Sequence, residues 1–362
     1  MKFRTAALSL LLSVCLAPAI GNCQKALHGW QRSGAKYDRE LIGELKAAIT
    51  DNTYKKINGI VVIKNGKLLI EEYFNGENRD SLHDPRSVGK TFASAILGIA
   101  LRDGYIKTLD EPLSDFYDLK LYENYSDRKG KVTLRQFLTM SSAFDGDDNV
   151  NNSPGNEENM YPQPNWVDWA LSLPVDERRK PGQDWHYFTA GAMLLGDILD
   201  RRVPGGLEKY SDKKLFRPLG IGHREWVYTP QHGPSTAGGF RLSALDFAKF
   251  GQLYEDGGTW NGTRVIPKSW VAASFHKYLQ TSFPGDSYGY LWWNKKFEVG
   301  GKSYETYYCS GNGGNKIFVF TDQPLVVVVT ASAYNTKYMH SQVDEMMTKY
   351  ILPAIVAEDL PK

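Results

Sequence analysis

Cysteine is scarce in this chain of 362 residues, which contains only three. One lies in an N-terminal apolar run, so only Cys23 and Cys309 remain for the rest of the chain. Two isolated cysteines provide neither a disulfide framework nor a paired-cysteine zinc site. The sequence also lacks the HExxH pattern, the Walker A loop and the GxGxxG pattern. We therefore expect no metal and no nucleotide, and we predict no cofactor.

An excess of charge of either sign is also absent. Lys and Arg number 43 against 41 Asp and Glu, and the chain has no basic run. Such a chain offers no electrostatic footprint for a nucleic acid. Apolar residues make up 42% and charged residues 23%, which is typical of a globular protein with a substantial core.

The N-terminal apolar run is too short to cross a bilayer, which takes roughly 20 residues. It covers residues 6–16, follows Lys2 and Arg4, and precedes several small residues. A charged start, a short apolar stretch and small residues are typical of a secretory signal. We therefore predict that residues 1–22 are a signal peptide and that the protein is exported, to the periplasm or the medium.

Cys23 leaves a second form of export open. Cleavage directly before Cys23 would give a lipoprotein with a lipid anchor on that cysteine. Residues 20–22 match a lipobox only in part, because Asn22 stands where a small residue is expected. Cleavage after Ala19 or Gly21 would instead release a protein without an anchor. The oligomeric state stays open.

Both ends of the chain carry strand signals. Near the start, aliphatic runs flank Asn65 and Gly66, and Asn-Gly between such runs is the strongest short signal for a β-hairpin. Near the end, further antiparallel strands are predicted, followed by a final helix at about 342–355. The predicted strands cover residues 60–63, 68–70, 288–293, 304–309, 317–320 and 325–330.

The middle of the chain has a different character. Helical spacing of apolar residues predicts a helix over 38–50, and an almost uninterrupted apolar helix of small residues covers 91–101. Residues 105–285 are mostly helix and loop, and within them the polar segment 145–165 predicts a long surface loop.

These signals predict an α+β fold, with one antiparallel sheet built from both chain ends and flanked by helices. We expect residues 23–105 and 286–362 to form the sheet domain and residues 106–285 a mainly helical domain. A cleft between two such parts is the default place for a small-molecule or peptide substrate, and we place the active site there.

Ser87 and Lys90 form the first element of a candidate site. Ser-x-x-Lys is a weak pattern by itself, and only the pair at 87 and 90 opens a long apolar helix. Residues three apart share a helix face, so Lys90 can reach the Ser87 hydroxyl. A lysine on so apolar a helix is partly desolvated, which lowers its pKa and allows it to act as a base. The alternative is a serine cap with an exposed lysine. The sequence contains five Ser-x-x-Lys pairs in all, at 33/36, 87/90, 126/129, 211/214 and 274/277.

Two further segments join this element. Tyr187 and Thr189 follow a Pro-Gly turn and precede an apolar stretch, at the start of a predicted helix, although a tyrosine in such a patch is usually core packing. Ser310, Gly311 and Asn312 belong to a glycine-rich segment between two predicted strands. Glycines there allow the backbone to approach a ligand and to present N–H donors, and the alternative is a hairpin bulge.

Together with these elements, three other segments resemble the serine β-lactamase and penicillin-binding-protein superfamily. They are VTLRQFLTMSS at 132–142, FGQL with GGTWNG at 250–262, and YGYLWW at 288–293. The resemblance lies in the branch that groups class C β-lactamases with esterases and peptidases, and it covers nearly the whole mature chain. It implies the β-lactamase/transpeptidase-like fold.

The resemblance also implies roles for individual residues. Ser87 is then the acylated nucleophile, Lys90 its partner and Tyr187 the general base and later acid. The backbone N–H groups of Ser87 and Asn312 form the oxyanion hole. The implied chemistry is acylation of the serine followed by hydrolysis of the acyl-enzyme by water.

Two positions depart from the family pattern. Thr189 replaces the usual Asn of the Tyr-x-Asn element, which implies an altered substrate preference. The residues CSG at 309–311 stand where penicillin-recognising members have Lys-Thr-Gly or His-x-Gly, so no cation is expected there for a substrate carboxylate. Neutral short-chain esters should then be preferred by at least tenfold, unless an arginine such as Arg241 or Arg264 replaces the cation. Cys309 has no adjacent base, and we expect it to be buried and inert.

Three hypotheses follow from the sequence. The first is an exported serine hydrolase that forms an acyl-enzyme with an ester, amide or lactone. The second is a true β-lactamase or D-Ala-D-Ala carboxypeptidase. The third is a catalytically silent binding protein, which the joint presence of Ser87, Lys90 and Tyr187 disfavours.

Overall fold

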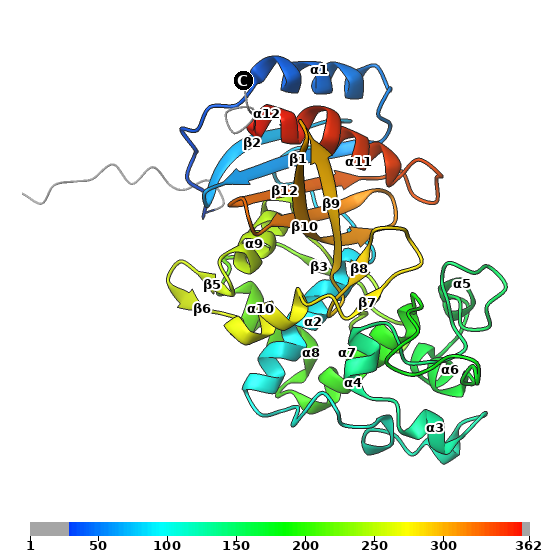
Figure 1. Ribbon diagram of the computed structural model, residues 1–362. Coiled ribbons are helices and arrows are strands. Elements are labelled where there is room, and N and C mark those ends of the chain that lie inside the picture. The colour runs from blue at the N-terminus through cyan, green and yellow to red at the C-terminus, as the bar shows by residue number, and fades with distance from the viewer. Residues whose placement is uncertain (1–28, 357–362) are drawn as a thin grey trace, which may run out of the picture.

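The computed structural model describes residues 29–356 and has one large antiparallel sheet (Figure 1). Its eight strands lie in the order β2-β1-β12-β11-β10-β9-β8-β7. Strand β1, from near the start of the chain, pairs with β12, from near its end, so the two chain ends share one sheet. The predicted α+β class and the predicted origin of the sheet are both confirmed. The strands are β1 (Ile57–Lys64), β2 (Lys67–Tyr73), β7 (Leu279–Gln280), β8 (Ser287–Tyr288), β9 (Trp293–Val299), β10 (Lys302–Gly311), β11 (Asn315–Phe320) and β12 (Leu325–Ala331).

The predicted hairpin joins β1 to β2. Asn65 and Gly66 adopt φ angles of 51° and 70°, and Lys64 pairs with Lys67 across the turn. Both turn residues therefore have the positive φ that a two-residue hairpin of this kind requires, and this is why Asn-Gly is found there.

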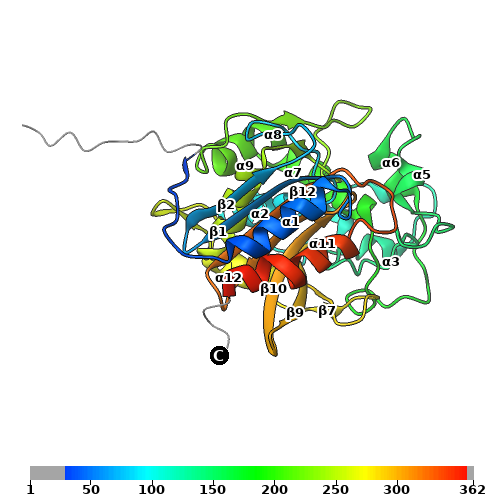
Figure 2. The same cartoon turned by 90° about the horizontal axis from the view of Figure 1, so that it is seen from above.

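Helices cover both faces of the sheet. Helices α1 (Arg39–Thr50), α11 (Ser341–Met346) and α12 (Leu352–Val356) lie over one face, as Figure 2 shows. Helix α9 (Ala244–Glu255) contacts β1, β11 and β12, and α2 (Val88–Arg102) contacts β10 and β11, both on the opposite face. Because both faces are covered, β12 is buried along its whole length, and its first five residues are a continuous apolar run rather than an alternating one.

The remaining elements lie mainly below the sheet in Figure 1. Helix α7 contacts α2, α4, α6 and α8 and forms the centre of this helical part. The helices are α3 (Asp127–Gly130), α4 (Leu134–Leu138), α5 (Glu157–Met160), α6 (Trp166–Ser172), α7 (Thr189–Arg202), α8 (Gly206–Ser211) and α10 (Lys268–Ser274), with short strands β3 (Glu225–Trp226), β4 (Phe240–Arg241), β5 (Thr259–Trp260) and β6 (Thr263–Arg264).

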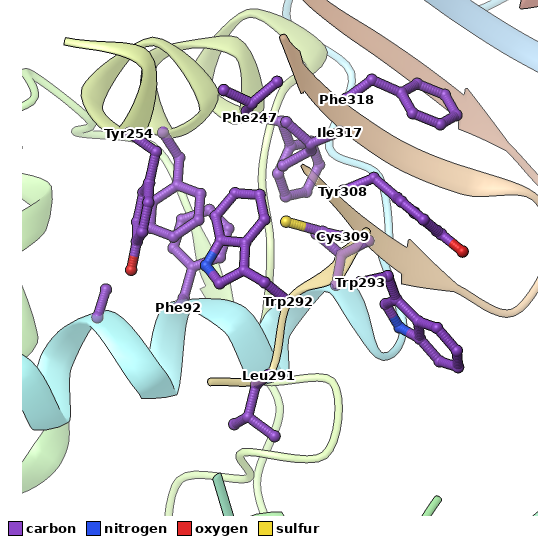
Figure 3. Packing of buried hydrophobic residues seen from close by; sticks show 14 of the residues in the cluster. Phe92, Phe247, Tyr254, Leu291, Trp292, Trp293, Tyr308, Cys309, Ile317 and Phe318 are labelled. Carbon is purple, nitrogen blue, oxygen red and sulfur yellow. The ribbon is translucent and has the colours of Figure 1, made fainter. Parts of the chain in front are cut away.

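The packing between α2, α9 and the sheet is largely aromatic (Figure 3). The rings of Phe92 on α2 and Phe250 on α9 stack with centroids 3.6 Å apart. Trp292 stacks beside Phe250 at 6.1 Å, and Cys309 of β10 points into the same cluster. This core holds α2 against the middle of the sheet, and α2 begins at the candidate nucleophile.

Two predicted elements differ from the structure. The run 288–293 is not one strand, since β8 ends at Tyr288 and β9 begins at Trp293. Between them Leu291 takes a φ of 60°, and its N–H donates to the carbonyl of Leu138 in α4. The chain therefore bends at this edge of the sheet and contacts the helical part. No local sequence pattern predicts this hydrogen bond between residues 138 and 291. The final helix is also interrupted, by a π-helical turn at Met347–Ile351 between α11 and α12.

The predicted signal peptide and Cys23 lie outside the described residues. Within residues 29–356, every helix is too short or too polar to span a bilayer.

Candidate active site

Ser87 stands at the N-terminus of α2, directly before its first residue. Its backbone is already helical, with φ −60°, and its side chain does not cap the helix. The preceding Arg86 has a φ of 51°, so the chain turns sharply into the helix. Gly89 in the first turn lies against Gly238, where a Cβ would stand 1.8 Å from the carbonyl oxygen, so only glycine fits. The hydroxyl of Ser87 is thus free for other partners.

Lys90 is the partner of Ser87. Its Nζ lies 2.6 Å from the Ser87 Oγ and 3.1 Å from the carbonyl oxygen of Ala237. The side chain is 1% exposed, and among residues 29–356 it forms no salt bridge. Burial lowers the pKa of Lys90, while the nearby carboxylates of Glu157 and Asp148 oppose that shift. The pKa shift favours the neutral amine that a general base requires.

The contacts separate this Ser-x-x-Lys pair from three of the others. Lys129 donates to two backbone carbonyls, Lys214 pairs with Asp103, and Lys277 pairs with Glu305. The hydroxyls of Ser211 and Ser274 donate to carbonyls of their own helices. None of these lysines places its Nζ on the serine three residues before it; Lys129 meets Ser126 only through its backbone N–H, which donates to the serine hydroxyl at 3.1 Å. Among these four pairs, the one that opens the apolar helix α2 is the one whose lysine Nζ contacts its serine hydroxyl.

Tyr187 completes the group. It lies just before α7, and its ring centroid is 5.2 Å from the Lys90 Nζ. Burial raises the pKa of Tyr187, although a hydrogen bond with Ser87 opposes the shift. Tyr187 is therefore a neutral phenol at ordinary pH, in contact with the serine hydroxyl. The structure thus brings Ser87, Lys90 and Tyr187 together at one place.

The segment 145–165 is mostly irregular and largely exposed, as its polarity predicts, but several of its acids are partly buried. It contains the short helix α5 and folds against the start of α7. Asp148 accepts a hydrogen bond from the Thr189 backbone N–H at 2.8 Å, and Glu157 accepts one from the Thr189 hydroxyl at 3.0 Å. These two acids therefore bind a buried residue, whereas Asn149, Asn151 and Asn152 of the same segment are exposed. Pattern analysis missed both acids because their partners are more than 30 residues away.

Thr189 itself is fully buried and lies behind the site. Its hydroxyl is used by Glu157, and it is not among the residues that line the cleft. Glu157 and Asp148 do line the cleft, and the backbone N–H of Glu157 donates to Asp148 at 2.8 Å. Burial beside Glu157 raises the pKa of Asp148 to about 7. Thr189 thus contributes by holding this acidic pair, in contrast to the expected contact with substrate.

The glycine-rich segment lies where the end of β10 meets the start of α2. Cys309, Ser310 and Gly311 are the last residues of β10 rather than part of the loop. A Cβ on Gly311 would stand 1.9 Å from the Pro85 carbonyl oxygen and 3.3 Å from the Ser87 nitrogen, so a side chain cannot fit. The absence of a side chain brings the strand and the nucleophile into direct contact.

Asn312 follows this contact. Its side chain is held by Asn335, whose backbone N–H donates to Oδ1 at 2.8 Å. Within the described part of the chain, the backbone N–H groups of Ser87 and Asn312 donate to no other protein atom. Two free N–H groups on adjoining segments are the donors that an oxyanion hole requires.

Cys309 is fully buried and faces the aromatic core, as Figure 3 shows. Burial raises the pKa of the Cys309 thiol well above its usual range. A thiol in such surroundings is not a nucleophile.

Lys316 is the residue that sequence analysis missed. It pairs with Ser310 across the β10–β11 hairpin, and its Nζ lies 2.7 Å from the Ser310 Oγ. The expectation of a site without a cation beside CSG is therefore wrong, because the neighbouring strand supplies one. The hairpin register would have revealed it, since residues 310 and 316 are equidistant from the turn. Neither arginine proposed as a substitute lines this cleft: Arg241 pairs with Glu225, and Arg264 donates to the carbonyl of Gly257.

Most of these residues line one open cleft of about 1350 Å³. Ser87, Tyr187, Ser310, Gly311, Asn312 and Lys316 all contribute to it. Aromatic side chains, including Phe283 and Trp293, form another part of the wall, and the two rings lie 5.8 Å apart. Among residues 29–356 no cluster of three or more His, Cys, Asp or Glu is arranged to hold a metal ion.

Comparison with known proteins agrees with this arrangement. The family described as Beta-lactamase matches residues 48–345. Protein flp of Staphylococcus aureus (strain N315) is 23% identical over 193 residues, which cover 51% of this chain and 37% of flp. The 6-aminohexanoate-dimer hydrolase of Paenarthrobacter ureafaciens is 23% identical over 269 residues, which cover 67% of this chain and 66% of that enzyme. The chain thus spans less than two thirds of the length of either relative.

A solved structure from Bacillus anthracis, named provisionally as a 6-aminohexanoate-dimer hydrolase, superposes with a TM-score of 0.70. It is 23% identical and covers 88% of this chain and 83% of its own. At this identity the likeness concerns the fold, and it confirms the predicted β-lactamase/transpeptidase-like architecture.

Proposed function

Since the chain belongs to the β-lactamase family of serine hydrolases, which has amidase and esterase relatives, we propose that it is an exported serine hydrolase that cleaves an ester, amide or lactone. The covalent intermediate is an acyl group on Ser87. Export rests on the signal pattern at residues 1–22. The single observation that supports this chemistry best is the 2.6 Å contact between the Lys90 Nζ and the Ser87 Oγ at the N-terminus of α2.

The pKa shifts favour Lys90 over Tyr187 as the group that accepts the proton. Burial lowers the pKa of Lys90, which favours its neutral form, whereas it raises the pKa of Tyr187, which disfavours a phenolate. In acylation the Ser87 Oγ forms a bond with the carbonyl carbon, and its proton passes to the Lys90 Nζ. The electron pair of the carbonyl moves to its oxygen, which the N–H groups of Ser87 and Asn312 stabilise.

The tetrahedral adduct then collapses. The carbonyl reforms, the bond to the leaving group breaks, and the leaving group takes a proton. Tyr187 is in contact with Ser87 and near Lys90, so its hydroxyl can pass the proton from the ammonium to the leaving group. Water attacks the acyl-enzyme by the same route in reverse, and Ser87 regains its proton.

A fluorophosphonate probe tests the nucleophile without knowledge of the substrate. The wild type should be labelled on one serine, and Ser87→Ala should abolish labelling. Ser310→Ala is the matched control, because Ser310 lines the same cleft and is also bonded to a buried lysine. If Ser87→Ala is labelled as fast as the wild type while Ser310→Ala is not, Ser310 is the nucleophile and our proposal is wrong. Tyr187→Phe should lower turnover by about 10² or more, the usual range for an acid–base group.

The β-lactamase or D-Ala-D-Ala carboxypeptidase hypothesis stays as the second candidate, and one observation favours it. Both kinds of substrate carry a carboxylate near the scissile bond, and Lys316 lines the cleft. Intact-mass spectrometry after exposure to penicillin, nitrocefin and p-nitrophenyl esters distinguishes the candidates by the adduct that accumulates. A protein that forms no adduct and turns over none of them supports the silent binding protein.

A further inference from the structure

We propose that Lys316 is a specificity-determining residue that binds a carboxylate of the substrate, beside the scissile carbonyl. This inference rests on the proposed hydrolase function and names the substrate class: an ester or amide that also bears a carboxylate. Three features carry it, namely the position of Lys316, its unpaired charge and the partners of the groups around it.

The position of Lys316 follows from strand register. Ser310 and Lys316 are paired neighbours, and Ser310 directly precedes Gly311, where a Cβ would stand 3.3 Å from the Ser87 nitrogen. The anion site thus lies one residue along β10 from the point of contact with the nucleophile. Successive residues of a strand face opposite sides, and Figure 3 shows Tyr308 directed away from the core that receives Cys309. Lys316 lies 4.7 Å from the Tyr308 ring centroid, on that opposite side.

Among residues 29–356, the ammonium group of Lys316 has no ion-pair partner. The side chain is 4% exposed yet lines the cleft, and within residues 29–356 it forms no salt bridge. Its one hydrogen bond to a side chain is the 2.7 Å contact with the Ser310 hydroxyl. Burying an ammonium group without an anion is unfavourable, so a site of this kind gains most from a ligand that brings a negative charge.

The acids near Lys316 already have other partners. Asp344 of α11 pairs with Lys295 of β9 at 2.6 Å. Asp286 accepts a hydrogen bond from the Tyr308 hydroxyl at 2.6 Å. The charges of these two acids reach Lys316 only through space.

The other titratable groups near Lys316 provide no negative charge. Burial lowers the pKa of His340 well below its usual range, and burial raises the pKa of the Cys309 thiol, so both are neutral. Lys295 is a second cation and, after burial, the largest factor that lowers the pKa of Lys316, to about 7. A bound carboxylate would favour the protonated form and raise that pKa. A bound anion would therefore stabilise the protonated form of Lys316. Without an anion, Lys316 loses its proton as the pH rises above about 7.

The test compares matched substrates that differ only in charge. p-Nitrophenyl hemiesters of succinate and glutarate are compared with the corresponding monoamides, and 3- and 4-acetoxybenzoate with their benzamides. These pairs place the carboxylate on the acyl side and on the leaving-group side, respectively. Wild-type kcat/KM should favour the carboxylate in at least one set by about tenfold or more, the usual effect of a charge-assisted hydrogen bond.

Lys316→Met removes the charge and keeps the length of the side chain. It should reduce the preference to near unity, because the loss of kcat/KM falls mainly on the carboxylate-bearing member of each pair. Lys277→Met is the matched control, because Lys277 lines the same cleft but pairs with Glu305, and it should leave the preference unchanged. An equal loss for both members of a pair, or a wild type indifferent to the carboxylate in both sets, overturns the proposal.

Two further measurements do not depend on a folded variant or on turnover. In the wild type, the preference for the carboxylate should fall as pH rises above about 7, because Lys316 loses its proton. A preference that stays constant from pH 6 to 10 contradicts the assignment. Calorimetry on Ser87→Ala with glutaryl-p-nitroanilide and its amide analogue measures binding alone. Selective binding there, without hydrolysis by the wild type, would reject the proposed function and keep the anion site; equal binding of the two would reject the site.

Discussion

Replacing Lys90 by methionine should separate catalysis from stability. The substitution removes the amine that lies 2.6 Å from the Ser87 Oγ, and loss of a general base lowers the rate by about 10² or more. A factor of 10² corresponds to about 2.7 kcal/mol of transition-state stabilisation. On the stability side, the carbonyl of Ala237 loses its donor, which costs about 1–3 kcal/mol, while removal of a desolvated amine offsets part of that cost. We therefore expect the free energy of unfolding to change by less than about 2 kcal/mol.

Lys129→Met is the matched control for this experiment. Lys129 is equally buried, and its Nζ donates to the carbonyls of Glu123 and Leu171, far from the cleft. It should lose at least as much stability as Lys90→Met and keep the fluorophosphonate labelling rate of the wild type. Urea denaturation and the second-order labelling rate give the two quantities without any choice of substrate. If Lys90→Met is labelled at more than a third of the wild-type rate, Lys90 does not activate the serine, and the mechanism proposed above is refuted.

Four further outcomes follow from the described geometry and the N-terminal sequence. For a neutral ester, kcat/KM should rise with pH on the acid side, because Lys90 must lose its proton to act as a base and burial lowers its pKa; initial rates from pH 5 to 10 measure this, and a falling profile contradicts it. Thr189→Val should destabilise the protein by about 1–3 kcal/mol, since Glu157 loses a donor, whereas Thr189→Ser should restore most of the loss in chemical denaturation. Cys309 should resist iodoacetamide in the native state and react after unfolding, as peptide mass spectrometry would show; rapid native labelling would mean that the thiol is accessible. The N-terminus of exported protein should lie at residues 20–23, and Edman sequencing that finds the complete leader on it would reject the signal.

The local parts of the fold were predictable because short-range rules determine them. Asn65 and Gly66 fix a hairpin through their own φ angles, and Ser87 and Lys90 meet because a helix places residues three apart on one face. The family resemblance then supplied the role of Tyr187, which lies more than 90 residues further along and has no local signal for that role.

The missed features all depend on contacts between distant segments. Asp148 and Glu157 of the 145–165 segment are positioned by Thr189, and only the folded chain shows that they lie near Lys90. The CSG motif at 309–311 contains no cation, but the neighbouring strand β11 places Lys316 beside Ser310. Strand pairing decides such cases, and a linear motif does not record it.

The pairing of β1 with β12 determines when the protein can acquire its structure. Residue Ile57 finds its partner at Ala331, so β1 and β2 cannot join the sheet until nearly the whole chain is available. Contacts between residues so far apart in the chain slow folding, because a long loop must close before they form. The nucleophile helix is synthesised early, yet β10, which lies against its N-terminus, is among the last segments made. A partly synthesised chain therefore has no assembled catalytic centre, and late folding of this kind is compatible with the export that we propose.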